Sequence, residues 1–356
     1  MSVTGTITLA TRGSDLATRQ AQQVQSRLAD HRIDADLRTV ETKGDRIEDA
    51  LIQDLGKTGA FVRELDRLVV DESVDGAVHS MKDVPTEEPP EIVVAAVPAR
   101  GPATDVLITP DGDDLDDLPS GAVVGTSSLR RGAQLQARRP DLAIAPLRGN
   151  VDTRIEKLLA PGLQAEHETR LEAAEDEDVA PPDERDPEEW FDDLAEIERA
   201  ALGRDVETEY DAIVLAKAGL ARSDLLSTVP SVELPIDTHV PAAGQGALAV
   251  AAHEGSDAAD AIRRTLDHPP TRVETTVERV LLEELGAGCV APVGIHAILQ
   301  GDVVQTRVQV LSRDGSETVA DRRALPVDSY ATAARAFAAD LKDRGAADLV
   351  EAARRE

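Results

Sequence analysis

Residues 6–40, TITLATRGSDLATRQAQQVQSRLADHRIDADLRTV, decide the fold class. The apolar run 6–10 predicts a strand, the amphipathic stretch 16–28 a helix and the run 35–40 a second strand. The alternation continues with a helix and two further strands, at 61–70, 76–78 and 92–97. Strands that alternate with helices indicate an α/β domain with a largely parallel sheet.

Two further blocks follow. A second α/β block is predicted from strands and helices at 106–108, 123–124, 129–138, 142–145, 151–159 and 212–216. The last third of the chain predicts a small α+β domain with an antiparallel sheet. Its helices are expected at 258–266, 271–285 and 328–343, and its strands at 293–299, 303–311 and 318–325. Between them, residues 161–209 are acidic and contain prolines. We expect there a solvated, partly disordered surface insertion with a helix over 190–202.

Composition limits the possible functions. The 356 residues include 68 Asp and Glu against 38 Lys and Arg, a net charge of −30, which argues against nucleic-acid and anionic-membrane partners. No apolar run reaches the 18–20 residues of a membrane span, and no secretory signal is recognisable at the N-terminus. The single cysteine excludes an intramolecular disulfide, so we expect a cytoplasmic protein. Few lysines, 2% aromatic residues and many carboxylates suggest adaptation to high salt.

Cationic and hydroxyl side chains gather where predicted strands end, whereas no zinc or nucleotide-phosphate motif is present. They lie in four segments, ATRGS (10–14), HSMKDVP (79–85), GTSSLRR (125–131) and LRGNVDTR (147–154). Open α/β sheets bind ligands at such strand ends. Each arginine alone could pair with a surface acid, and the hydroxyls could be helix caps. Together, in so acidic a chain, they indicate a polyanionic ligand held between two domains.

Two residues suggest chemistry beyond binding. Asp83 lies beside Lys82, where cations would keep a carboxylate ionised, so it is a candidate acid/base, although it could be only a turn residue. Cys289 lies in GAGCVAPVG (286–294), where glycines would let a bulky group approach the sulfur, although a lone cysteine is usually an inert buried residue.

These motifs, together with Leu16, Ala17, Gln20, YDAIVLAKAGL (210–220) and PAAGQGAL (241–248), closely resemble the hydroxymethylbilane synthase family, also called porphobilinogen deaminase. The resemblance implies a transferase that joins four porphobilinogen molecules with release of ammonia. It then hydrolyses the chain to hydroxymethylbilane for heme, siroheme and cobalamin. It also implies a dipyrromethane cofactor held by a thioether to Cys289, and a monomer that could hand its product to uroporphyrinogen-III synthase.

The resemblance also implies residue roles. Asp83 would be catalytic, contacting pyrrole N–H groups and stabilising the azafulvene cation formed as ammonia departs. The cofactor would bind Cys289, Ser80, Lys82, Thr126, Ser127, Ser128, Arg130 and Arg131. The substrate would bind Arg12, Ser14, Gln20, Arg148, Arg154, Arg222 and Gln245. No metal is expected.

The family pattern predicts two lobes like those of type II periplasmic binding proteins and two crossings between them. The expected domains are residues 1–99 with 241–266, 100–240, and 267–356. The segment 42–58 is expected to move as the product grows. Two departures stand out. The family's lysine before the 61–70 helix lies one residue earlier, at Lys57, and its Asp-Pro-Arg-Asp segment reads Pro102-Ala103-Thr104-Asp105.

Two other functions fit part of the pattern. A non-catalytic solute receptor would also use two hinged lobes with a cationic cleft, but it needs neither Cys289 nor Asp83. A phosphate-binding enzyme could use the helix start at 125–131, but no metal-binding carboxylate motif accompanies it.

Overall fold

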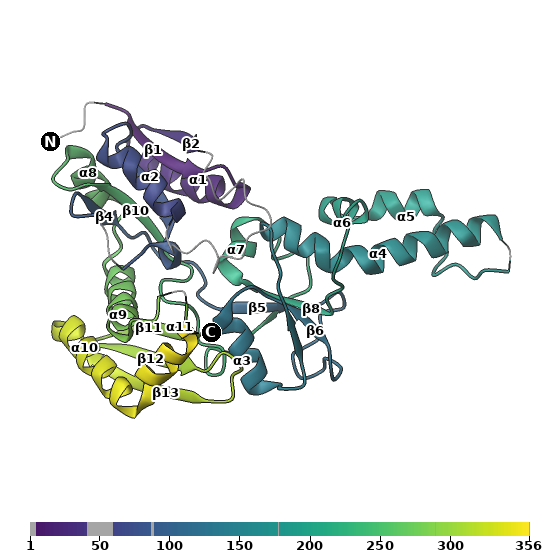
Figure 1. The fold of residues 1–356 in the computed structure, drawn as a ribbon. Coiled ribbons are helices and arrows are strands. Elements are labelled where there is room, and N and C mark those ends of the chain that lie inside the picture. The colour runs from purple at the N-terminus through teal and green to yellow at the C-terminus, as the bar shows by residue number, and fades with distance from the viewer. Residues whose placement is uncertain (1–4, 41–59, 87–88, 177, 289, 356) are drawn as a thin grey trace.

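The computed structural model describes residues 5–40, 60–86, 89–176, 178–288 and 290–355, and within them the strands form three sheets (Figure 1). The first sheet has the order β2-β1-β3-β10-β4. Its strands are β1 (Ile7–Arg12), β2 (Ala35–Val40), β3 (Gly76–Ser80), β4 (Ile92–Ala96) and β10 (Leu248–His253). β2, β1 and β3 are parallel, as predicted, whereas β10 returns from late in the chain and is antiparallel to β3 and β4.

Helices cover both faces of this sheet and complete the first lobe. They are α1 (Asp15–Asp30), α2 (Ala60–Val70) and α8 (Asp257–Leu266). Val24 of α1 and Ile262 of α8 pack on one face, and Leu65 of α2 packs on the other. Because β1 and β3 are parallel, Arg12 and Ser80 lie at the same end of the sheet.

The second lobe repeats the arrangement with the order β7-β6-β8-β5-β9. Its strands are β5 (Asp105–Ile108), β6 (Val123–Gly125), β7 (Ala143–Ala145), β8 (Ala212–Ala216) and β9 (Val232–Glu233). β7, β6 and β8 are parallel, and β5 is antiparallel to β8. α3 (Leu129–Arg138) covers one face, and α4 (Val151–Glu175) and α7 (Lys217–Arg222) cover the other.

Two chain segments connect the lobes and lie against each other. The Gly101 backbone N–H donates to the Gly246 carbonyl at 3.0 Å. Gly246 has φ +84°, and a Cβ there would lie 2.5 Å from the Pro102 carbonyl oxygen, so only glycine fits. We call these two segments, residues 97–104 and 240–247, the hinge.

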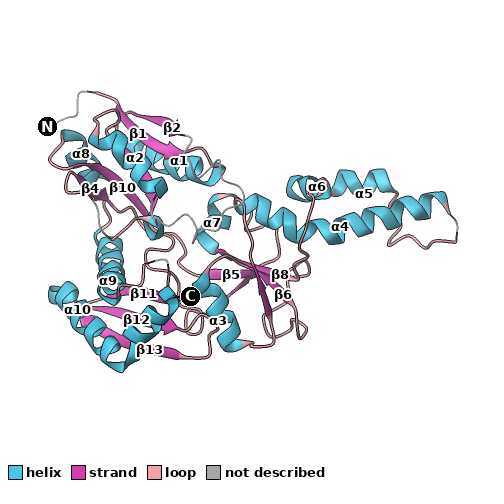
Figure 2. Cartoon of the chain, in the orientation of Figure 1, coloured by secondary structure: helices cyan, strands magenta, loops and turns pink. Residues whose placement is uncertain are grey.

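The C-terminal unit has a three-stranded antiparallel sheet with helices on one face (Figure 2). Its strands are β11 (Val293–Gln300), β12 (Val303–Leu311) and β13 (Thr318–Pro326). Its helices are α9 (Pro269–Leu285), α10 (Tyr330–Leu341) and α11 (Ala347–Arg355). Together with the two α/β lobes, this confirms the expected fold class. α11 is an addition, because the last predicted helix ended at residue 343.

The insertion at 161–209 is helical over much of its described length, with turns and loops at 178–186 and 203–209, so it has more regular structure than the single expected helix. α4 continues to Glu175, and α5 (Pro187–Asp193) and α6 (Glu196–Leu202) replace the single helix expected over 190–202. These helices project away from the body as an arm (Figure 1). Trp190 is 2% exposed, stacks on His167 and lies under the Arg170 guanidinium, so the arm has a small core of its own. None of the described helices is both long and apolar enough to cross a membrane.

Candidate functional site

Asp105 is the centre of a buried cationic cluster between the lobes. Its carboxylate lies 2.8 Å from the guanidinium nitrogens of both Arg130 and Arg131. All three side chains are at most 8% exposed. Burial alone would raise the pKa of Asp105, but the two arginines outweigh it and hold that pKa well below its usual range. One ionised acid therefore faces two buried guanidinium groups.

Gln245 and Gln134 connect this cluster to the hinge. Gln245 Nε2 donates to Asp105 at 2.9 Å and to the Ala103 carbonyl at 2.6 Å, and its Oε1 accepts from Arg130. Gln134 and Arg130 both donate to the Val240 carbonyl. The predicted ligand residue Arg130 thus also binds the segment that returns to the first lobe, and Gln245, which lies in that segment, binds the Asp105 cluster.

Lys82 and Arg154 add two more cations beside the cluster. Burial lowers the pKa of Lys82 below its usual value, and the charges of Arg131 and Arg154 act in the same direction, whereas Asp83 and Asp105 oppose it. Burial, assisted by Arg131, lowers the pKa of Arg154 to about 10. Arg154 donates to the Gly149 carbonyl, and within the described part of the chain no acid forms an ion pair with Lys82 or Arg154. Positive charge therefore exceeds negative charge here.

The predicted hydroxyl residues bond mainly to nearby backbone. Ser14 caps α1 by accepting from the Ala17 N–H, and Ser128 caps α3 by accepting from the Arg131 N–H. Thr126 accepts from the Ser128 N–H. Ser127 bonds to the backbone of Leu147, which joins the 125–131 and 147–154 segments. Within the run 126–128, the capping interpretation therefore holds for Ser128, and Ser14 is a further helix cap.

Asp83 lies at the end of a short 3-10 turn, Met81–Asp83, directly after β3, and its side chain is exposed. The Met81 N–H donates to the Ala247 carbonyl of the hinge at 3.0 Å. Gly244 has φ +73°, and a Cβ there would lie 2.6 Å from Met81 Cγ and 3.1 Å from the Lys82 nitrogen. Glycine at this position lets the hinge pass against the turn that presents Lys82 and Asp83.

The other predicted residues are more widely spread. Arg12 ends β1, Arg148 follows the Ser127–Leu147 link, and Gln20 is buried in α1. Arg222 donates to the Gly246 carbonyl at 2.7 Å, and burial, together with Arg27, lowers its pKa to about 10. Cys289, Lys57 and the expected mobile segment 42–58 lie outside the described residues.

Sequence reasoning missed three buried groups next to the site. Asp105 was recognised only as a remnant of a family motif, although an acid that opens an apolar strand is itself a signal. Arg100 and Glu278 form a buried ion pair at 2.8 Å between the hinge and α9. His239 is 2% exposed, and burial, followed by Arg130 and Arg138, lowers its pKa to about 4 against the opposing charge of Asp105.

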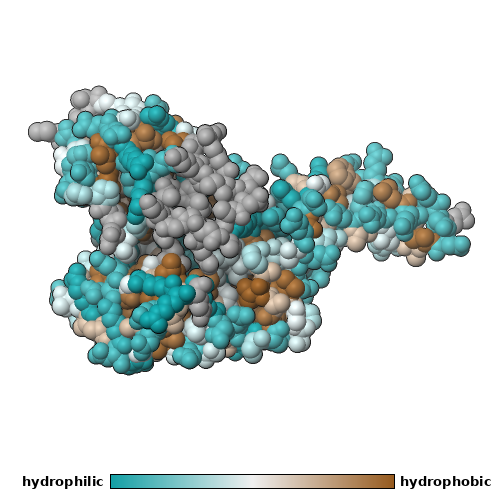
Figure 3. Space-filling view, viewed as in Figure 1, coloured by the Kyte–Doolittle hydropathy of each residue, from teal (hydrophilic) through white to brown (hydrophobic). Residues whose placement is uncertain are grey.

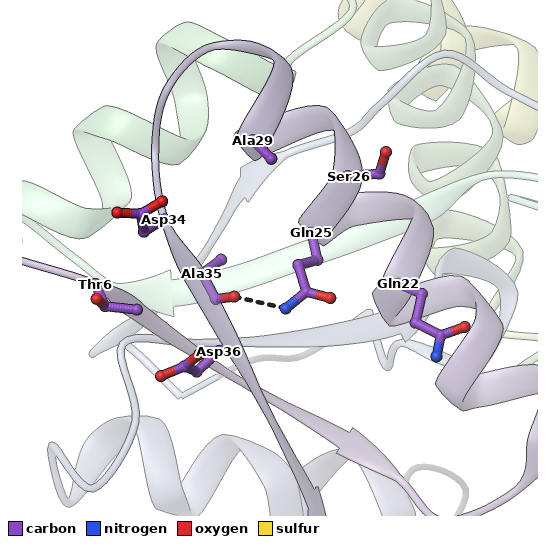
Figure 4. Close-up of a pocket in the computed structure, with 8 residues that line it drawn as sticks. All are labelled: Thr6, Gln22, Gln25, Ser26, Ala29, Asp34, Ala35 and Asp36. Carbon is purple, nitrogen blue, oxygen red and sulfur yellow. Dashed lines mark hydrogen bonds between the residues drawn. The ribbon is translucent and has the colours of Figure 1, made fainter.

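A hollow of about 520 Å³ lies elsewhere, between α1 and β2 (Figure 4). Gln25 of α1 points across it and donates to the Ala35 carbonyl at 2.6 Å. Thr6 and Ala35 lie at the starts of β1 and β2, so this hollow is at the opposite end of the strands from Arg12. Its lining includes two acids, Asp34 and Asp36, and no cation, which does not suit an anionic ligand.

Two family models match the chain. The family model "Porphobilinogen deaminase, dipyromethane cofactor binding domain" matches residues 7–167 and 199–261. The model of the "Porphobilinogen deaminase, C-terminal domain" matches 273–336. Residues 168–198, the outer part of the arm, fall outside both matches.

Curated relatives match along the whole chain. A probable porphobilinogen deaminase of Halobacterium salinarum is 54% identical over 390 residues, covering 98% of each chain. The porphobilinogen deaminase of Rubrobacter xylanophilus is 39% identical and covers 97% of each. Among solved structures, a putative methionine-binding lipoprotein from Bacillus subtilis has 12% identity and a TM-score of 0.35, covering 76% of this chain and 93% of that one. A similarity that low says nothing about the ligand. By its family matches and its full-length relatives, the chain belongs to the porphobilinogen deaminase family.

Proposed function

We propose that this chain is a hydroxymethylbilane synthase whose chemistry takes place beside the Asp83 turn and the Asp105 cluster. It joins four porphobilinogen molecules with release of ammonia and hydrolyses the product to hydroxymethylbilane for tetrapyrrole synthesis. The observation that carries the assignment of the site is its surplus of positive charge. Four cations, Arg130, Arg131, Lys82 and Arg154, lie near two described acids, Asp105 and Asp83.

This donor set fits the family's dipyrromethane cofactor. Pyrrole units with acetate and propionate groups are polycarboxylates, and arginine forks bind carboxylates through two parallel hydrogen bonds. Arg130, Arg131, Lys82 and Ser128 would hold the cofactor's carboxylates, with Cys289 as its covalent attachment through a thioether. When bound, the cofactor supplies the pyrrole carbon from which the chain grows.

Asp83 has the position and chemistry for the reacting end. Its exposed carboxylate would accept a hydrogen bond from a pyrrole N–H and stabilise the positive charge that develops on the substrate as ammonia leaves. The same oxygen atoms can take the proton that the new α-carbon loses. Arg154 would bind a carboxylate of the substrate, as Lys82 would bind one of the cofactor. Both contacts would offset the desolvation that lowers the pKa values of these two side chains.

Several broader features belong to the same proposal. We assign three domains, residues 1–99 with 241–266, 100–240, and 267–356, because each contains one sheet. Arg12, Ser14, Gln20, Arg148, Arg222 and Gln245 would contact the substrate. The protein would act as a monomer in the cytoplasm. A high-salt cell is supported by the net charge of −30 and by the relative from Halobacterium salinarum.

The experiment is steady-state turnover of porphobilinogen by Asp83→Asn in molar KCl. Loss of the carboxylate charge should lower kcat by at least about 100-fold while the fold and the cofactor, checked by intact mass, are retained. Asp71→Asn, an exposed acid of the same lobe just after α2, is the matched control and should keep wild-type turnover. Near-normal turnover by Asp83→Asn would refute its catalytic role. Absence of turnover and of any covalent group in the wild-type chain would favour a solute-binding function instead.

A further inference from the structure

The Asp83 turn is held by both backbone and side chains. The Met81 N–H donates to the Ala247 carbonyl of the hinge, and the Val84 N–H closes the turn on the Met81 carbonyl. The Met81 and Val84 side chains are buried in a cluster with Val97, Ala247 and Ala249. The Asp83 side chain itself is exposed, so neighbouring side chains do not enclose it. The position of the carboxylate therefore depends on where the backbone of residues 82–85 is fixed.

Packing is incomplete on the side of the turn that faces α9. A cavity of about 180 Å³ lies there, and Met81 and Thr86, on either side of Asp83, both line it. Val94 and Val97 also line it from the first lobe, and Val280 lines it from α9. On this side the cavity takes the place of close contacts that would help to fix the backbone.

Arg279 of α9 reaches across this boundary. Its Nη1 donates to the Val84 carbonyl at 2.9 Å, and its Nη2 donates to the Pro85 carbonyl at 2.8 Å. These are two successive carbonyls, and they directly follow Asp83. Hydrogen bonds from a charged guanidinium are stronger than neutral ones, and the planar fork fixes both carbonyls in one orientation.

The same helix leads to the attachment cysteine. α9 ends at Leu285, four residues before Cys289 in the sequence. Glu278, the residue before Arg279 in α9, accepts a hydrogen bond from the Gly244 N–H at 2.6 Å. Gly244 in turn lies against Met81 and Lys82. Thus α9 contacts both the hinge and the turn that carries Asp83.

We propose that Arg279 is a positioning residue for Asp83, an inference that rests on the proposed catalytic role of Asp83. By fixing the carbonyls of Val84 and Pro85 from the C-terminal unit, Arg279 sets the place of the Asp83 carboxylate. A misplacement of about 1 Å at a reacting centre can reduce a rate by about 100-fold. The role therefore concerns kcat more than the affinity for porphobilinogen.

Arg272 provides a matched control on the same helix. It binds the Val94 and Ala95 carbonyls of the first lobe at 3.2 and 3.0 Å and pairs with Asp267, but it does not bind the Asp83 turn. Arg279→Gln and Arg272→Gln each remove one bridge between α9 and the first lobe. Only the first should alter the turn.

The experiment measures kcat and KM per cofactor-loaded molecule, with loading determined by intact mass, for Arg279→Gln, Arg279→Lys and Arg272→Gln. We expect Arg279→Gln to lower kcat by about 10- to 100-fold with KM changed less than threefold, and Arg279→Lys to recover part of the loss. Arg272→Gln should keep kcat within about twofold. Hydrogen exchange at the amides of residues 83, 84 and 86 should speed up in Arg279→Gln and stay unchanged in Arg272→Gln.

A kcat of Arg279→Gln within twofold of wild type, or equal losses in Arg279→Gln and Arg272→Gln, would overturn the positioning role. Unchanged exchange at residues 83–86 would do the same, whatever the activity. Asp83→Asn, measured in parallel, separates this from the proposed function. If Asp83→Asn is inactive and Arg279→Gln is normal, only the positioning role is wrong, whereas an active Asp83→Asn removes the catalytic role itself.

Discussion

Two buried ion-pair clusters touch the hinge, and they differ in charge balance. Arg100 and Glu278 form a one-to-one pair with two parallel bonds of 2.8 and 3.1 Å. Both oxygens of Glu278 also accept backbone N–H groups, those of Gly244 and Ala297. Around Asp105, by contrast, two arginines share one carboxylate, with Lys82 and Arg154 nearby.

The difference separates a structural ion pair from a binding site. Buried charges are stable only when paired, so the balanced Arg100–Glu278 pair needs nothing further. The Asp105 cluster lacks negative charge, and an anionic ligand would supply it. A buried cluster that lacks negative charge in the free protein therefore marks a place where an anionic ligand binds.

The largest expected effect on stability comes from breaking the balanced pair of Arg100 and Glu278. Glu278→Gln keeps the shape but leaves Arg100 without a counter-charge and turns an amide N–H toward the Gly244 or Ala297 N–H. We expect the free energy of unfolding to fall by about 3–5 kcal/mol. Chemical unfolding in molar KCl measures this. The cofactor content of the molecules that do fold should stay at the wild-type level.

Arg131→Gln is the contrasting variant. It leaves Asp105 paired with Arg130 and hydrogen-bonded to Gln245, so the buried carboxylate keeps one counter-charge. The unfolding free energy should therefore fall by no more than about 2 kcal/mol, while cofactor loading is lost. If Arg131→Gln proved as destabilising as Glu278→Gln yet fully loaded with cofactor, the two clusters would not differ in the way described.

The next largest expected effect is the pH dependence of stability that arises from His239. Its pKa falls from 6.5 to about 4 on folding, through burial first, with Arg130 and Arg138 adding to the effect. The folded state binds fewer protons than the unfolded state between these values. Stability is therefore complete above about pH 6.5 and is lost as the pH falls toward 4, by about 3 kcal/mol in all. His239→Gln should remove this part of the pH dependence, and thermal unfolding from pH 7 to 4 measures it. Parallel curves for the two proteins would contradict the assignment.

The smallest expected effect is the dependence of Tm on salt, which arises from acidic side chains on the surface. The arm, residues 161–209, has 19 Asp and Glu against four Arg, so it carries −15 of the net −30, and its visible face is mostly hydrophilic (Figure 3). Added KCl screens this repulsion, so Tm and activity should rise from dilute to molar salt. The quadruple variant Glu172→Gln, Glu175→Gln, Glu188→Gln and Glu189→Gln should flatten the rise in Tm but leave kcat unchanged. A flat response of the wild-type chain would remove the salt-adaptation hypothesis.

Local periodicity was enough to predict most of the fold. Strands such as β1 and β8 and helices such as α1 and α3 follow from apolar spacing and from caps such as Ser14 and Ser128. α11 was missed because Gly345, with φ +100°, interrupts the helical pattern between it and α10. The arm was misjudged because its order depends on Arg170, His167 and Trp190, whose contact joins distant positions in an acidic sequence.

The residues of the site could be predicted from the sequence, but their charge balance could not. The motifs contain Lys82, Asp83, Arg130 and Arg131. Nothing local in the sequence indicates that both arginines pair with Asp105, which lies 25 and 26 residues away. The same holds for Arg279, whose partners Val84 and Pro85 are 195 and 194 residues distant. Such pairings arise only when strands and domains come together, so they need the structure.

The central claim is that the cationic surplus holds a polycarboxylate attached at Cys289. The most direct test is the intact mass of the purified wild-type chain beside Cys289→Ser, after incubation with porphobilinogen in molar KCl. We predict an added mass of two deaminated porphobilinogen units on the wild-type chain and none on Cys289→Ser. A wild-type chain that remains unmodified, or an equal addition on Cys289→Ser, would contradict it.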